Sequence, residues 1–255
     1  QFAVLEAAAP GRSDLGIGRA PGSDPVTSVM LRSGRGDEDI ANFPDYLDHV
    51  RAMMSSRGVQ VQLRDGDYLL KATPAAAGEP RLWLLGSSMY SARLAAAKGL
   101  PYVFAHHFSG QGTEEALAYY RENFTPSEVC AAPTTFLTVN ASVAETRDEA
   151  TALMLPNLQM MARLRTGRPL GAVDLVEDAQ AAAASDSEQR IIDSGLRRAV
   201  VGTPAEAAEQ LTALAEQFAV DEVMINPVAS AHRGTDPATA PGRERTLELL
   251  AKELL

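Results

Sequence analysis

Apolar strands that each lead into a helix are the feature of this sequence that most constrains its fold. Residues 82–85 (LWLL) and 102–105 (YVFA) are uninterrupted apolar runs, and each is followed by a turn and a helical segment. Residues 134–139 (TTFLTV) repeat the pattern with several β-branched side chains. A strand without a polar face is typical of a parallel sheet that is covered on both sides. The sequence therefore predicts an α/β fold.

Capping residues mark several helix boundaries. Thr203 and Pro204 are expected at the N-cap and the first position of a helix, because a hydroxyl acceptor and a fixed φ favour helix initiation there. Asn42 is the expected N-cap of another helix. A long helix is expected within residues 142–165, and Pro156 should kink or split it. The other predicted elements are a helix at 1–9, a strand at 14–19, a hairpin at 59–70, helices at 89–98 and 113–123, a strand at 221–226 and a helix at 243–254.

The length of 255 residues allows either one large α/β barrel or two ordinary domains. No glycine-rich dinucleotide-binding motif follows a strand, and no short repeat indicates a solenoid. We therefore expect a single barrel domain over residues 1–255. Glycine, proline and a run of alanines make residues 166–190 irregular, and we expect an insertion or a mobile segment there.

The charge balance excludes some classes of partner. Lys and Arg total 23 against 33 Asp and Glu, a formal net charge of -10, which argues against general affinity for nucleic acid or anionic membranes. Cys130 is the only cysteine, so an internal disulfide is excluded and a reducing compartment is expected. No run of about 20 apolar residues and no signal peptide is recognisable. The sequence predicts a soluble, cytoplasmic protein.

Four separated motifs resemble the luciferase-like flavin-dependent monooxygenases, in particular the bacterial luciferase and alkanal monooxygenase branch. The motifs are residues 11–19 (GRSDLGIGR), 84–88 (LLGSS), 105–108 (AHHF) and 201–206 (VGTPAE), and their order covers essentially the whole chain. The resemblance implies a TIM-like (β/α) barrel that holds reduced FMN at the C-terminal ends of its strands. It also implies that the flavin and O2 oxidise an aldehyde or another small organic substrate.

The same resemblance makes residues 11–19 the fourth strand of the family's barrel. About the first three βα units of the family are then expected to be missing before Gln1, and the barrel to be incomplete. Unpaired strand edges would favour a homo-oligomer. A separate flavin reductase is the implied supplier of reduced FMN. The alternatives are a deazaflavin-dependent oxidoreductase of the same fold, a non-catalytic flavin-binding or partner subunit, and an inactive fragment.

Gly86, Ser87 and Ser88 lie between a buried strand and a helix. Backbone N–H groups, the helix dipole and two hydroxyls can converge on a phosphate there, and the resemblance assigns this turn to the FMN phosphate. A plain helix cap is the alternative. Arg19 follows another strand, where it is expected either to bind the flavin phosphate or to form a surface ion pair with Asp24.

His106 and His107 end the strand at residues 102–105. Alternation along a strand sends them to opposite faces, so only one is expected to point into the barrel mouth. A histidine there can hydrogen-bond the flavin or act as an acid or base near pH 7, and the alternative is a structural histidine bonded to a carbonyl. No Asp, Glu or His stands at a convincing ligand spacing, so no metal site is expected.

Overall fold

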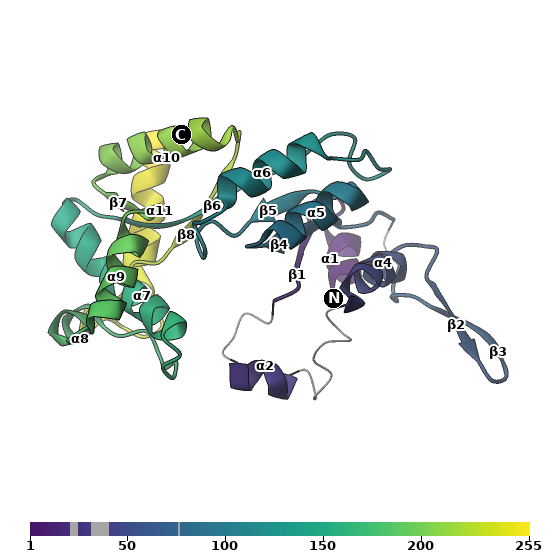
Figure 1. The fold of residues 1–255 in the computed structure, drawn as a ribbon, viewed down its shortest axis with the longest axis horizontal. Coiled ribbons are helices and arrows are strands. Elements are labelled where there is room, and N and C mark those ends of the chain that lie inside the picture. The colour runs from purple at the N-terminus through teal and green to yellow at the C-terminus, as the bar shows by residue number, and fades with distance from the viewer. Residues whose placement is uncertain (21–24, 32–40, 76) are drawn as a thin grey trace. The chain divides into compact units, whose positions relative to one another are not determined.

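The structure is a computed structural model, and it describes residues 1–20, 25–31, 41–75 and 77–255 (Figure 1). These residues form two compact units. The first is Gln1–Phe104 with Glu114–Thr135, and the second is Ala105–Thr113 with Phe136–Leu255. Each unit is built around a three-stranded parallel sheet.

The sheet of the first unit has the strand order β1-β4-β5. Its strands are β1 (Asp14–Gly18), β4 (Arg81–Gly86) and β5 (Tyr102–Phe104). The register pairs Gly18 with Leu85 and Gly86 with Phe104, so the C-terminal ends of the three strands lie at one edge. The two apolar strands predicted here are confirmed, and Leu84 is fully buried.

Helix α5 (Met89–Lys98) connects β4 to β5. It buries three alanines against the sheet, namely Ala92, Ala95 and Ala96. Gly99 ends it with φ 60°, the left-handed conformation that most residues avoid, and its N–H bonds to the last turn. A Cβ at Gly99 would come within 2.4 Å of the Thr125 carbonyl oxygen, so glycine at this position also has a steric reason.

The other elements of the first unit lie around this sheet. They are α1 (Phe2–Ala8), α2 (Pro25–Leu31), α4 (Phe43–Met54), the antiparallel hairpin of β2 (Val59–Leu63) and β3 (Gly66–Leu70), and most of α6 (Thr113–Glu122). The hairpin and the other predicted helices are confirmed, whereas α2 was not expected. Asn42 is the N-cap of α4, as predicted, but it does not cap the helix with its side chain. Its backbone has ψ 1°, outside the extended region that aims a capping side chain, and its side chain caps no N–H of this fully described helix.

The sheet of the second unit has the strand order β7-β6-β8. Its strands are β6 (Leu137–Val143), β7 (Val200–Gly202) and β8 (Val223–Pro227). Helices α7 (Arg147–Arg165), α10 (Pro204–Phe218) and α11 (Pro241–Leu254) all contact the central strand β6. Thr203 accepts a hydrogen bond from the Glu206 N–H and completes a capping box, which confirms the predicted start of α10.

Two elements differ from the prediction by three or more residues at a boundary. The strand expected at 134–139 is β6 and runs from Leu137 to Val143, because pairing with β7 and β8 extends it. The following helix starts at Arg147, capped by Thr146. It is not split at Pro156, which lies buried inside α7.

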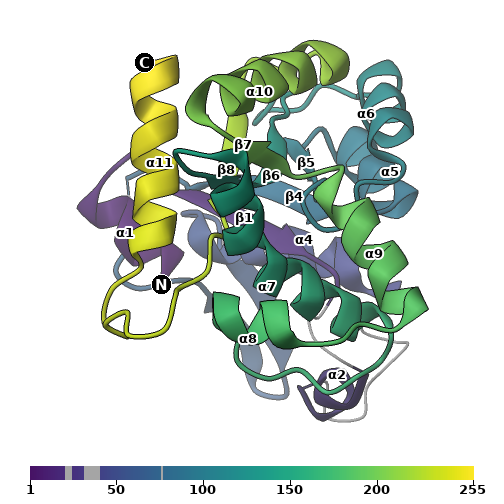
Figure 2. The same ribbon diagram turned by 90° about the vertical axis from the view of Figure 1, so that its left-hand side faces the viewer.

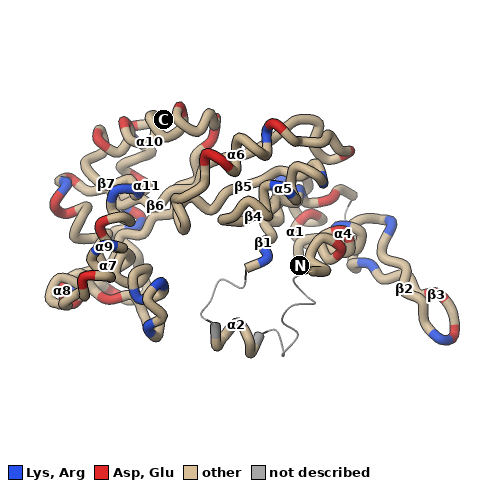
Figure 3. Tube along the Cα trace, in the orientation of Figure 1, with Lys and Arg blue, Asp and Glu red and all other residues tan. Residues whose placement is uncertain are grey.

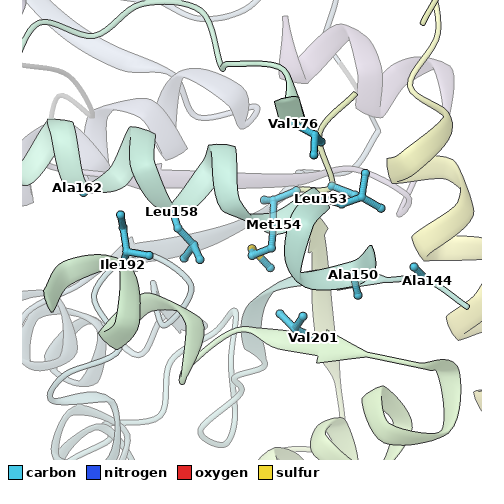
Figure 4. Close-up of a cluster of buried hydrophobic side chains, with 11 residues drawn as sticks. Ala144, Ala150, Leu153, Met154, Leu158, Ala162, Val176, Ile192 and Val201 are labelled. Atoms are coloured by element: carbon cyan, nitrogen blue, oxygen red, sulfur yellow. The ribbon is translucent and has the colours of Figure 1, made fainter. Parts of the chain in front are cut away.

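Residues 166–190 contain α8 (Val176–Ala181) and the start of α9 (Asp186–Leu196), and Figure 2 shows both packed along α7. Val176 and Ile192 are buried in an apolar cluster with residues of α7. Figure 4 shows Ile192 beside Leu158, and Met154 above Val201 of β7. That this segment is an insertion relative to the family stays a prediction.

Figure 3 shows acidic residues on several helices of both units, in keeping with the net charge of -10. Within the described residues, no helix is both long and apolar enough to cross a bilayer.

Candidate functional site

The turn between β4 and α5 presents donors at the C-terminal edge of the first sheet. Gly86 ends β4, and Ser88 is the N-cap of α5 with an extended backbone (φ -147°, ψ 162°). The Ser88 side chain does not cap α5, all of whose residues are described, and Ser87 and Ser88 are exposed. Two exposed serines therefore stand at the N-terminus of a helix, an arrangement that suits an anion.

This turn is held in place by Ser91, a buried residue in the first turn of α5. Its hydroxyl donates to the Ser88 carbonyl at 2.7 Å and lies 3.3 Å from the Tyr102 hydroxyl. Burial raises the pKa of Tyr102 to about 12, so the phenol stays protonated. A Cβ at Gly86 would lie 2.2 Å from the Ser91 Oγ, so only glycine lets the end of β4 approach the helix this closely.

Arg19 follows β1 directly. Because Gly18 is paired with Leu85, Arg19 continues β1 toward the level of Gly86. Its guanidinium carbon lies 4.0 Å from the centre of the Tyr90 ring, in the first turn of α5. The structure thus brings Arg19 to the start of the helix that follows Gly86, Ser87 and Ser88. The alternative partner Asp24 lies outside the described residues.

His106, in the second unit, is buried. Its Nδ1 lies 2.9 Å from the Thr113 Oγ1, and its ring packs edge-on against Phe218 with centroids 5.1 Å apart. Burial, with smaller contributions from the Arg198 charge and from His107, lowers the pKa of His106 to about 4. The imidazole of His106 is therefore neutral at pH 7.

His107 points to a different partner. Its Nδ1 lies 2.7 Å from the Thr138 Oγ1 of β6, and its carbonyl accepts a hydrogen bond from the Asn140 side chain at 3.0 Å. Asn140 in turn accepts from Asn226 of β8 at 2.8 Å. Desolvation lowers the pKa of His107 as well, so this imidazole is also neutral at pH 7. These contacts tie the segment after β5 to strands β6 and β8.

Both histidines line one pocket of the second unit. Its other polar lining residues were not predicted from the sequence, and they are Asn140, Asn157, Arg165 and Arg198. A signal for Asn140 was present, because Thr138, Asn140 and Ser142 alternate with apolar residues along β6 and so share one face. The two arginines carry no comparable signal. In the described parts of the chain, no group of three or more His, Cys, Asp or Glu side chains is arranged to hold a metal ion.

Comparison with known proteins decides the family. The sequence model of the luciferase-like monooxygenases matches residues 1–222. The chain belongs to the luciferase-like monooxygenase family. It is 35% identical to YvbT of Bacillus subtilis over 98% of this chain and 70% of the relative. It is 34% identical to a luciferase-like monooxygenase of Escherichia coli K12, over 89% of this chain and 65% of the relative.

Solved structures agree with this assignment. Apo-MsnO8 is 29% identical and superposes with a TM-score of 0.76 over 99% of this chain and 71% of its own. The FMN complex of the oxygenating constituent of 3,6-diketocamphane monooxygenase from Pseudomonas putida is 19% identical, with a TM-score of 0.62 over 99% of this chain and 73% of its own, and shows the fold alone. The predicted family and the predicted α/β fold of the luciferase-like TIM-barrel type are confirmed. This member of the family spans 65% to 70% of the length of the two relatives named above.

Proposed function

We propose that this luciferase-like protein is a flavin-dependent monooxygenase that uses reduced FMN and O2 to oxidise a small organic substrate such as an aldehyde. The observation that carries the proposal is the contact of Arg19 with Tyr90, beside the exposed turn of Gly86, Ser87 and Ser88. A guanidinium, two hydroxyls and a helix N-terminus gathered at one edge match the needs of a phosphate dianion.

The residues of this turn fit the terminal phosphate of FMN. Arg19 would donate charged hydrogen bonds to it, Ser87 and Ser88 would donate from their hydroxyls, and the first N–H groups of α5 would donate beside them. Bound reduced FMN supplies the electrons that activate O2. The close packing of Gly86 on Ser91 keeps these donors in one arrangement before the ligand arrives.

We assign His106 and His107 to the catalytic pocket. Both are neutral at pH 7, so each can donate from one ring nitrogen and accept at the other without a net charge. Hydrogen bonds between each Nδ1 and the hydroxyl of Thr113 or Thr138 orient the rings. The Nε2 atoms would then hold or move a proton at the substrate or the flavin.

We further propose that a separate flavin reductase supplies the reduced FMN, and that the protein acts in the cytoplasm as a homo-oligomer. The reductase is inferred because no dinucleotide-binding motif follows a strand. The buried free thiol of Cys130 is compatible with a reducing compartment. Apolar side chains exposed on the β2–β3 hairpin, such as Leu63 and Tyr68, would suit contact with another copy.

A deazaflavin-dependent oxidoreductase is the second candidate. A secondary alcohol dehydrogenase and a tetrahydromethanopterin reductase, both described as dependent on F420, have similar folds, with TM-scores of 0.56 and identities of 15% and 12%. A non-catalytic flavin-binding subunit is the third. Neither would consume O2 in a substrate-dependent manner.

The test is O2 uptake by the purified chain with reduced FMN, with and without decanal, in the presence of catalase to remove peroxide. The proposed function predicts uptake that depends on decanal, formation of decanoate, and loss of at least tenfold in rate in His107→Asn. Decanal-independent uptake without decanoate, by a folded chain that binds FMN saturably, would identify a flavin-binding subunit. Decanal-independent reduction of F420 by a secondary alcohol would identify the deazaflavin enzyme.

A further inference from the structure

The pocket that contains His106 and His107 has an apolar wall and a cationic wall. Leu158 and Met161 of α7 and Ile191 of α9 form the apolar part. Arg165, at the end of α7, and Arg198, before β7, contribute the charges. An apolar surface beside two guanidinium groups matches an organic anion with an aliphatic body better than it matches a neutral ligand.

Neither arginine forms an ion pair with a carboxylate in the part of the chain that the structure describes. Arg165 donates to the Phe108 carbonyl and Arg198 to the Ser194 hydroxyl, and both of these acceptors are uncharged. Other arginines of the second unit are neutralised, as in Arg168 with Glu188 at 2.7 Å and Arg147 with Glu206 at 3.0 Å. Among the described residues, the pocket therefore holds two positive charges without a counter-charge.

Keeping these charges together is unfavourable in the absence of an anion. Burial lowers the pKa of the Arg198 guanidinium, and the positive charges of Arg165 and Arg197 lower it further. Structural hydrogen bonds alone could be made by an uncharged side chain, which would not carry the cost of desolvating a guanidinium. A bound anion would offset both the desolvation and the repulsion.

The position of Arg198 is set by the loop after β5. Gly110 has φ +67°, and a Cβ there would lie 2.1 Å from the Arg198 Cδ and 2.4 Å from its Nε. Only glycine leaves room for the arginine stem at this point of the loop. On the other side of the pocket, a Cβ at Gly195 would lie 2.8 Å from Leu158 Cδ2. The guanidinium is thus held by close packing on the loop that carries His106 and His107.

Asn157 adds a polar atom that lacks a partner. Its Oδ1 is buried, and no described residue donates a hydrogen bond to it. It lines the same pocket as Arg165 and Arg198. A buried amide oxygen without a donor is costly, and a ligand that brings a hydroxyl or a bound water would satisfy it.

We propose that this pocket binds the carboxylate of an aliphatic organic acid, with Arg165 and Arg198 as the anion receptor and Leu158, Met161 and Ile191 against the aliphatic chain. That this acid is the substrate rests on the monooxygenase function proposed above. The pocket would then select, among organic substrates, those that carry a carboxylate at one end. The binding step itself needs no flavin, so it can be tested separately.

The experiment measures binding of octanoate and of neutral octan-1-ol to the flavin-free chain by saturation-transfer NMR and calorimetry. We expect octanoate to bind at least tenfold more tightly than octanol. Arg198→Met and Arg165→Met should each weaken octanoate at least tenfold and leave octanol unchanged. Arg197→Met is the matched control, since it removes the same charge from the exposed neighbouring position, and it should change octanoate affinity less than twofold. Circular dichroism establishes that each variant is folded.

Three outcomes would overturn the proposal. Equal affinity for octanoate and octanol would show that the arginines do not recognise a carboxylate, as would equal effects of the three arginine substitutions. Weakened FMN binding in Arg198→Met, without competition between FMN and octanoate, would assign the charges to the flavin phosphate instead. If the monooxygenase assay fails, the octanoate result still stands. If the protein turns over decanal but its binding of octanoate does not depend on Arg165 and Arg198, the carboxylate proposal is wrong and the monooxygenase function stands.

Discussion

The guanidinium of Arg19 lies 4.0 Å from the centre of the Tyr90 ring, which places a cation from the end of β1 over the first turn of α5. Stacking on an aromatic face uses the flat side of the guanidinium and leaves its N–H edge available for hydrogen bonds. The pair therefore connects the strand end with the serine turn, and it explains how two motifs far apart in the sequence can act on one phosphate.

Tyr90 should act as a positioning residue for Arg19. An exposed cation–π contact contributes about 0.5–1 kcal/mol, so Tyr90→Leu should weaken FMN two- to fivefold. Riboflavin, which lacks the phosphate, should bind Tyr90→Leu as it binds the unmodified chain. Fluorescence titration with both flavins makes the comparison. Equal weakening for the two flavins would mean that Tyr90 acts on the ring system or on the fold.

Ser88 and Thr203 occupy equivalent N-cap positions but should respond differently to alanine. Thr203 accepts a hydrogen bond from Glu206, so Thr203→Ala should lower the free energy of unfolding by about 1 kcal/mol. Ser88 makes no such bond to its own helix, which is fully described, so Ser88→Ala should lower the free energy of unfolding by clearly less than Thr203→Ala does. FMN affinity should instead fall in Ser88→Ala alone. Urea unfolding and FMN titration of both variants measure the two effects. A large stability loss in Ser88→Ala would favour a plain helix-capping role for Ser88 over a phosphate-binding role.

Gly86 should tolerate no side chain. A Cβ there would lie 2.2 Å from the Ser91 Oγ and 2.4 Å from its Cβ, so Gly86→Ala should reduce stability by about 1–3 kcal/mol through overpacking. The double variant Gly86→Ala with Ser91→Gly should recover part of the loss. Gly171→Ala serves as the control, since nothing lies within 4 Å of a Cβ at that position. Additive losses in the double variant would locate the strain elsewhere.

His106 should make stability depend on pH. Its pKa is about 4 in the folded protein against 6.5 for the free side chain, so between these values the unfolded chain binds a proton that the folded chain does not. The contribution of neutral His106 to the free energy of unfolding is fully present above pH 6.5. It is lost as the pH falls, by about 2 kcal/mol at pH 5. Urea unfolding at pH 7 and pH 5 should show this loss, and His106→Asn should reduce it. An unchanged pH dependence in His106→Asn would refute the burial-lowered pKa.

The βα pattern could be predicted because its signals are local. Leu84 and Tyr102 lie within apolar runs, and Gly99 and Thr203 occupy positions where a short-range conformational or capping preference is strong. Strand β7 and helix α9 were not predicted as elements. Val200 and its two neighbours are too short a run to show a period. Helix α9 did carry a local signal that was missed, the capping box of Ser185 and Glu188, and burial of Ile192 against α7 stabilises it further.

The candidate site was predictable only in part. Arg19, Ser87 and Ser88 could be named because each directly follows a strand end, where ligands bind in α/β folds. Arg165 and Arg198 belong to segments that meet only through the packing of α9 on α7, so no sequence spacing relates them. The lowered pKa of His106 likewise depends on burial and on Arg198, neither of which a sequence motif contains.

The central claim is that the chain binds FMN through its phosphate at Arg19 and the serine turn. The most direct test is anaerobic titration with FMN and with riboflavin, using Arg19→Met and, as a matched control, Arg12→Met, which removes the same charge before β1. The account predicts saturable FMN binding that Arg19→Met weakens at least tenfold, with riboflavin and the Arg12→Met variant little affected. FMN affinity that is equal in Arg19→Met and Arg12→Met, or absent in a folded chain, would contradict it.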